Sequence, residues 1–201
     1  MKRAYGRPLY SPGEVYRILY YGMRAFPYLR QAARAGIMTP EFKERLMLAV
    51  TEVNGCALCA YGHTRMALES GMDRTEIEAM LGGELSEVPK EELAAVLFAQ
   101  HYAESRGLPS KAAWKQVEHL YGKKTACAVL SAVRVIMAGN ACGIPMGSLV
   151  CRFLPGKRDK VDKRSCVGYE VLLLFCLLPF AAVAWIQAVT AANVGLPFAD
   201  I

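Results

Sequence analysis

Residues 44–63 read ERLMLAVTEVNGCALCAYGH, and this stretch predicts two helices joined by a tight turn. Its apolar run, residues 46–53, follows a threonine and a proline at 39–40, which is a typical helix start. The first helix should end at Gly55, because glycine readily adopts the left-handed conformation that closes a helix. A second helix is predicted over residues 56–70, with another glycine as its stop.

Cys56 and Cys59 lie in the first turn of this second helix. The unpaired N–H groups and the positive dipole end of a helix start stabilise a thiolate over a thiol. The Cα atoms of two cysteines three residues apart on a helix are separated by about 5 to 6 Å, a distance that suits a disulfide. His63 follows one turn after Cys59 on the same face, so its imidazole can reach that sulfur directly or through one water. Cys59 is therefore the predicted nucleophile, and Cys56 is its resolving partner.

Glu44 is a candidate partner for these groups, although the residues alone leave its role open. It shares a helix face with an apolar line that leads towards Gly55, as expected of a partly buried carboxylate aimed at the cysteines. Its charged neighbours Lys43 and Arg45 equally allow an exposed, solvated residue. Glu52 is a rival carboxylate that lies nearer the cysteines in sequence.

Two other interpretations of the Cys-x-x-Cys pair remain open at this point. The pair could form half of a structural zinc site with His63, but no second Cys-x-x-Cys or His-x-x-x-His completes four ligands. Only His101 and His119 remain as imidazole donors. The cysteines could also be small buried core residues. We predict no bound metal and no cofactor.

The candidate residues share a wider motif: a glutamate, eleven intervening residues, then Cys-x-x-Cys-x-x-x-His. This spacing resembles the active-site pattern of the alkylhydroperoxidase D-like proteins in the carboxymuconolactone decarboxylase superfamily. It maps onto Glu44, Cys56, Cys59 and His63 without a gap, and it is much more specific than a bare Cys-x-x-Cys. The similarity covers roughly residues 8–155.

The resemblance implies a role for each residue of the motif. In the family the second cysteine is peroxidatic, the first resolves it, and the glutamate and histidine form a proton relay. The chain is then expected to be a thiol-dependent peroxidase that reduces hydroperoxides. The resemblance further implies a dithiol reductant, either a lipoyl or a thioredoxin-like protein, and a homo-oligomer, either a trimer or a hexamer.

His101 lies in a second stretch that looks like the same family, LFAQHYAESRG at residues 97–107. We name it as a candidate for lining the substrate pocket. The alternative is a structural role, because a single histidine in an apolar helix is more often a satisfied structural residue than a catalyst.

The rest of the sequence predicts an all-α protein. Helices are predicted over residues 11–34, 73–81, 89–105, 110–122, 124–137 and 148–153, with a break or bend at 140–145. There is no strand alternation and no glycine-rich phosphate loop in the sequence. We predict an alkylhydroperoxidase D-like helical bundle over residues 1–155, and a charged linker with a hydrophobic C-terminal helix over residues 156–201.

Composition limits the function classes further. Seven cysteines with scattered spacing and a first segment without an apolar stretch predict a reducing, cytoplasmic compartment. The formal net charge of +6 is spread over the first fifty positions and residues 157–164 without a recognition motif, so no nucleic-acid partner is expected.

Residues 171–194 are nearly all apolar. Two dozen helical residues span roughly 36 Å, which is enough for a bilayer core, so one interpretation is membrane contact through this segment. A polar stripe of Gln187, Thr190 and Asn193 suits a helix buried between subunits instead. The two interpretations stay open.

Peroxidase activity is the leading hypothesis, and two alternatives stand beside it. A lyase that decarboxylates a lactone, as the superfamily name suggests, needs acid–base groups but no redox pair. A non-enzymatic redox-sensing module would use the same disulfide to switch contacts.

Overall fold

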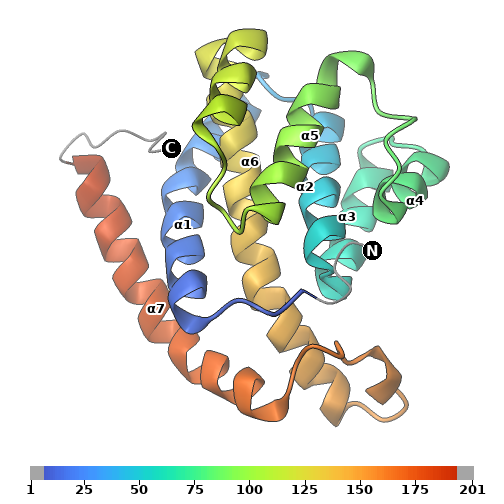
Figure 1. Cartoon of the computed structure of the whole chain (residues 1–201), viewed down its shortest axis with the longest axis vertical. Helices are drawn as coiled ribbons and strands as arrows, with labels where there is room; N and C mark the ends of the chain where they lie inside the picture. Colours follow the sequence, from blue (N-terminus) through green and yellow to red (C-terminus); the bar gives the residue numbers. More distant parts are fainter. Residues whose placement is uncertain (1–6, 194–201) are drawn as a thin grey trace.

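The computed structural model describes residues 7–193, and helices form all of the regular structure in that range. The elements are α1 (Pro12–Arg34), α2 (Pro40–Asn54), α3 (Ala57–Glu69), α4 (Arg74–Gly82), α5 (Lys90–Glu104), α6 (Lys111–Phe153), a short 3₁₀ helix η1 (Arg158–Lys160) and α7 (Val167–Asn193). The predicted all-α fold with an apolar C-terminal helix is confirmed (Figure 1).

Local signals in the sequence set the bounds of the first helices. Ser11 and Glu14 form a reciprocal capping box at the start of α1. The Thr39 hydroxyl caps α2 by accepting a hydrogen bond from the backbone N–H of Phe42. Gly55 ends α2 in the left-handed conformation, with a φ of 71°, as predicted.

α6 runs through the middle of the molecule, with α1 and α7 on one side and α3 and α4 on the other (Figure 1). α1 approaches α6 closely at Gly22, where an added Cβ would lie 2.7 Å from the Cβ of Ala138. The buried run of α2, which includes Leu46 and Leu48, fills the centre beside α5 and α6. The start of α3 is thereby held against α6.

The path of α6 corrects one prediction. The predicted stop at Gly122 is present as a kink, with a φ of 72° and a ψ of 160°. Of the break or bend predicted at residues 140–145, the break is wrong, because the helix continues through Pro145 to Phe153. Proline weakens a helix locally, but Ile144 and Pro145 are buried against neighbouring helices, and this packing outweighs the local preference.

The charged segment after α6 is tied to the bundle. The backbone N–H of Asp162 donates to the Ser148 hydroxyl at 3.2 Å, and the Arg164 guanidinium donates to the carbonyl oxygen of Asn54 at 2.9 Å. These contacts fix the segment at the end of α2 and the end of α6. The predicted domain division after residue 155 stays a prediction.

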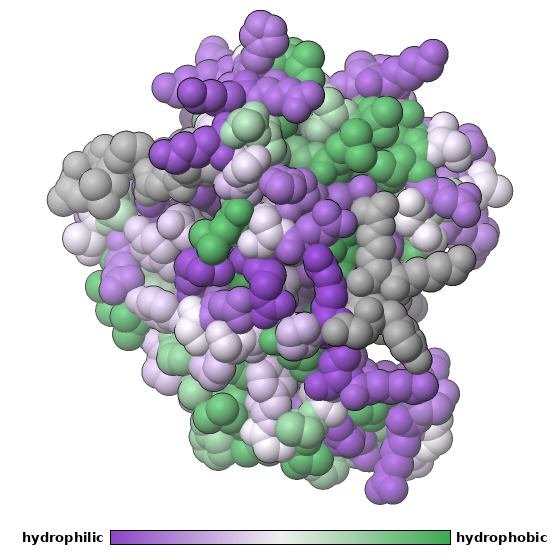
Figure 2. All heavy atoms as spheres, in the orientation of Figure 1, coloured by the Kyte–Doolittle hydropathy of each residue, from purple (hydrophilic) through white to green (hydrophobic). Residues whose placement is uncertain are grey.

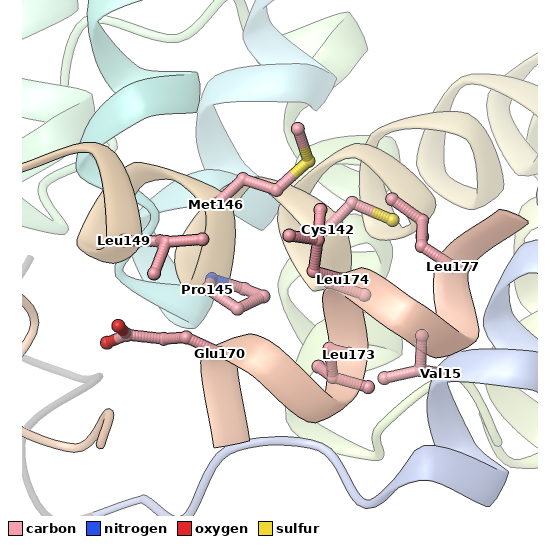
Figure 3. A pocket seen from close by; sticks show the side chains of 10 residues that line it. Val15, Cys142, Pro145, Met146, Leu149, Glu170, Leu173, Leu174 and Leu177 are labelled. Carbon is pink, nitrogen blue, oxygen red and sulfur yellow. The ribbon is translucent and has the colours of Figure 1, made fainter. Parts of the chain in front are cut away.

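α7 begins at Val167, four residues before the predicted start at 171, and the predicted end at 194 lies outside the described residues. Its first turn carries Glu170, which is 1% exposed. That carboxylate accepts hydrogen bonds from the Arg152 guanidinium and the Ser165 hydroxyl, both at 2.8 Å. Figure 3 shows Glu170 at one end of an apolar hollow between α6 and α7, which Cys142 and other side chains line. The paired carboxylate anchors the start of α7 to α6.

Among the described residues, α6 and α7 are long and apolar enough to cross a membrane by length and composition. The most apolar stretch of α6 is mostly buried, as in the core helix of a soluble protein, whereas that of α7 is mostly exposed. α7 therefore carries a large apolar face that no other part of residues 7–193 covers.

Candidate active site

The turn between α2 and α3 places both cysteines of the motif. Gly55 reverses the chain, and Cys56 follows as the N-cap of α3. The backbone N–H of Cys59 donates to the Cys56 sulfur at 3.2 Å, so the sulfur satisfies one of the free donors of the helix start. The predicted helix over 56–70 agrees with α3 to within one residue at each end.

A disulfide links Cys56 and Cys59, whose Cα atoms lie 5.3 Å apart. The spacing therefore does suit a disulfide, as the sequence predicts. The two residues differ in accessibility: Cys56 is fully buried, and Cys59 is partly exposed. An external reagent therefore meets Cys59 first.

The structure brings Glu44 of α2 and His63 of α3 into direct contact. The Glu44 carboxylate lies 2.7 Å from Nδ1 of His63. Because an ionised carboxylate only accepts hydrogen bonds, Nδ1 carries the proton and donates it, which leaves the lone pair on Nε2. His63 lies one turn after Cys59 on α3, so Glu44 orients an imidazole whose Nε2 can accept a proton on the same helix face as the cysteine.

Glu44 is 1% exposed, yet its surroundings favour the ionised form. Burial alone would raise the pKa of this carboxyl, but hydrogen bonds from His63 and Lys43 outweigh burial, and the pKa is lowered. The Lys43 ammonium lies 3.0 Å from the second carboxylate oxygen. The spacing of the motif does not predict this contact of Lys43 with Glu44, although Lys43 directly precedes Glu44 in the sequence.

Gly143 of α6 is a site residue that the sequence reasoning missed. A Cβ added to Gly143 would lie 2.8 Å from the Cys59 sulfur and 2.9 Å from the Cys56 sulfur. One turn later, an added Cβ at Gly147 would lie 3.4 Å from the Cβ of Leu58. The glycine pair lets α6 pack directly against the disulfide and the first turn of α3. A Gly-x-x-x-Gly spacing is the signal that indicates such a close approach.

We expect Gly143→Ala to lower the free energy of unfolding by about 1 to 3 kcal/mol, because the new methyl group overlaps both sulfurs. Gly139→Ala is the matched control one turn earlier, where an added Cβ meets only Ile136 of the same helix, at 3.8 Å. Alanine should stabilise the helix at that control position. Thermal and urea unfolding of the oxidised proteins measure both effects. Equal stability of the two variants would contradict the close packing of α6 on the disulfide.

Two further candidate residues, Glu52 and His101, take no part in the Glu44–His63 contact. Glu52, the rival carboxylate, is fully buried on α2, but the carboxylate bonded to His63 belongs to Glu44. His101 lies near the end of α5, and its Nε2 accepts a hydrogen bond from the backbone N–H of Ser110 at 3.2 Å. This contact supports the start of α6. The placement of His101 in a substrate pocket stays a prediction.

The neighbouring thiol of Cys142 does not compete for the chemistry of the disulfide. Cys142 precedes Gly143, and burial raises the pKa of its thiol to about 11, so it stays protonated at neutral pH.

Residues 7–193 contain no group of three or more histidine, cysteine or acidic side chains arranged to hold a metal ion.

The model of the carboxymuconolactone decarboxylase family matches residues 22–101, a range that includes the motif residues and His101. No curated protein and no solved structure matches the chain significantly. The family match agrees with the motif, whose members form two contacts on α2 and α3: the Glu44–His63 hydrogen bond and the Cys56–Cys59 disulfide. Residues 22–101 are thus similar to the carboxymuconolactone decarboxylase family, which includes the alkylhydroperoxidase D-like proteins.

Proposed function

We propose that the protein is a thiol-dependent peroxidase that reduces hydroperoxides at Cys59. The observation that carries this proposal is the Glu44–His63 hydrogen bond, one helical turn from a partly exposed cysteine that is already linked to a buried partner. A lyase needs acid–base groups but has no use for two sulfurs that can bond to each other. The cysteine pair therefore favours redox chemistry.

The reaction begins with the dithiol form. Nε2 of His63 accepts the Cys59 proton, and Glu44 stabilises the resulting imidazolium. The thiolate attacks one oxygen of the hydroperoxide, the O–O bond breaks, and the alkoxide leaves as an alcohol after it takes a proton from His63. Cys59 is thereby oxidised to a sulfenic acid.

The second step uses the buried partner. The Cys56 thiol attacks the sulfenic sulfur of Cys59, the disulfide forms, and water leaves. Burial protects Cys56 from direct oxidation, and its position at the N-cap of α3 stabilises its thiolate.

The disulfide must then be reduced by a dithiol, which we propose comes from a lipoyl or thioredoxin-like protein. The incoming thiolate attacks the accessible sulfur of Cys59, and Cys56 leaves as the thiolate that accepts the Cys59 N–H. Leu58 and Tyr61 flank Cys59 on α3, are 54% and 76% exposed, and offer an apolar surface to this partner. A cytoplasmic location and a trimeric or hexameric assembly stay predictions beside this proposal.

A steady-state assay tests the proposal. With a dithiol such as dihydrolipoamide, the protein should consume hydroperoxide catalytically and form one alcohol per dithiol oxidised. The same preparation is assayed for decarboxylation of a carboxylated lactone. Lactone turnover without peroxide turnover would replace the peroxidase by the lyase, and an absence of both activities would favour the redox-sensing module.

A further inference from the structure

We propose that the uncovered face of α7, together with the basic segment before it, binds the surface of an anionic lipid bilayer with the helix in the membrane plane. This inference does not depend on the proposed peroxidase activity. It rests on how the structure distributes the apolar, polar and charged residues of residues 153–193.

α7 has two opposite faces. Its inward face packs on α1 and α6 through Leu173 and a series of alanines that includes Ala184 and Ala188. Its outward face carries exposed large apolar side chains at helical spacing: Val171, Phe175, Leu178, Trp185 and Val189. Phe175, Leu178 and Trp185 are more than half exposed. Figure 2 shows hydrophobic residues gathered along the lower left edge of the molecule, where α7 runs. A large exposed apolar face of this kind marks a surface that binds a membrane or another protein.

Two of the three residues in the polar stripe, Gln187 and Thr190, have partners inside the chain instead. The Tyr16 hydroxyl donates to the side-chain oxygen of Gln187 at 2.6 Å, and Thr190 donates to the carbonyl oxygen of Ile186 at 2.9 Å. Residues 171–186 carry no charged, hydroxyl or amide side chain. A protein–protein interface normally has a polar rim and a hydrogen bond for about every 100 to 200 Å² of buried area. A lipid surface requires neither, so the outward face suits lipid better than a second protein.

The segment before α7 supplies complementary charge. Lys157, Arg158, Lys160 and Lys163 are exposed, whereas Asp159 is the single exposed acid of residues 157–164. Figure 1 shows this segment at the same end of the molecule as the start of α7. Phe153, 80% exposed, lies just before the segment. Basic side chains beside exposed apolar ones favour a membrane with anionic headgroups.

The contacts of α7 favour binding in the membrane plane over crossing the membrane. A crossing helix would have to leave α1 and α6, which breaks the Glu170–Arg152 ion pair and the Tyr16–Gln187 hydrogen bond. If a crossing α7 kept these contacts, α1 would enter the hydrocarbon layer with it. That is unfavourable because α1 has exposed charged residues, including Arg30 and Arg34. Binding through the outward face alone disturbs no contact of the bundle. It also leaves α3, on the opposite side of α6, in water (Figure 1).

Trp185 provides a direct test, because it is 62% exposed on the outward face, whereas Trp114 is buried and serves as a constant background. The full chain is mixed with phosphatidylcholine vesicles with and without phosphatidylglycerol. We expect cosedimentation with the anionic vesicles, a blue shift of Trp185 emission, and stronger quenching by lipids brominated near the headgroup than by lipids brominated deep in the chain.

Substitutions test whether the outward face of α7 and the basic segment before it are the surface that binds the vesicles. Phe175→Asp with Leu178→Asp should weaken vesicle binding by about tenfold or more, since both side chains would lose apolar burial. Leu108→Asp with Leu120→Asp, at exposed positions outside α7, is the matched control and should bind like the parent. Lys157→Glu with Lys160→Glu should remove the preference for anionic vesicles.

Three results would each overturn the proposal. The first is a protein that stays in the supernatant with anionic vesicles. The second is strongest quenching by the deep bromines, which indicates a crossing helix. The third is a lipid-free oligomer in which Trp185 is already shielded from water, which makes a second copy of the chain the occupant of this face.

Discussion

Replacing Cys59 with serine should abolish peroxide consumption, with a loss of at least about 1,000-fold, the scale expected when a catalytic nucleophile is removed. Serine keeps the size of the side chain but has neither an ionisable thiol nor a sulfenic acid state. Because the side chain is only partly buried at the start of α3, the helical content should not change. The measurement is the initial rate of hydroperoxide loss with a dithiol, together with circular dichroism.

Cys166→Ser is the matched control for this variant. Cys166 is an exposed free thiol in the loop before α7, and it should react with peroxide no faster than an ordinary surface cysteine. The control should retain the parental rate. A Cys59→Ser protein that consumes peroxide at the parental rate would remove the proposed nucleophile.

Replacing Glu44 with glutamine should slow disulfide formation by about 100-fold at neutral pH, because the imidazole loses the charge that orients it and that stabilises the imidazolium formed when it accepts the Cys59 proton. The amide has nearly the same shape as the carboxylate, so the effect reports the charge. The defect should shrink as the pH rises, since hydroxide then removes the thiol proton without help from His63. Stopped-flow measurement of reduced protein with hydroperoxide, at a series of pH values, gives this profile.

Glu41→Gln is a suitable comparison, because it removes an acidic charge from the first turn of the same helix without a contact to His63. It should leave the profile unchanged. If Glu44→Gln also reproduces the parental profile, the Glu44–His63 contact has no part in the chemistry.

The lowered pKa of Glu44 also predicts a pH dependence of stability. A carboxyl whose pKa is lower in the folded state stabilises the fold above its ordinary pKa, and that contribution is lost as the pH falls through the lowered value. Glu44→Gln should therefore show a smaller loss of stability at acidic pH than the parent. Urea unfolding at neutral and acidic pH measures the difference.

Much of the candidate site follows from local sequence. The turn at Gly55 and the position of Cys56 at the start of α3 depend on neighbouring residues, and local rules predict both. Local sequence does not predict which residue Glu44 contacts. Periodicity indicates which face of α2 it occupies, but burial or exposure of that face depends on α3, so only the family motif favoured its pairing with His63.

Contacts between distant segments explain what the sequence did not predict. Gly143 contacts the disulfide from more than eighty residues away, and no local pattern indicates which helix packs there. Pro145 looks like a helix break because local rules ignore burial, which holds α6 together through it. Gln187 looks like part of a polar stripe until the packing of α7 on α1 brings it to Tyr16.

Peroxide is expected to convert the thiols of Cys56 and Cys59 into one disulfide. The most direct measurement is intact-mass analysis and peptide mapping of the reduced protein after one equivalent of hydroperoxide, followed by alkylation. We predict the loss of two hydrogens, a peptide in which Cys56 and Cys59 are linked, and an alkylated Cys166. Recovery of Cys56 and Cys59 as alkylated thiols after the peroxide has been consumed would contradict this account.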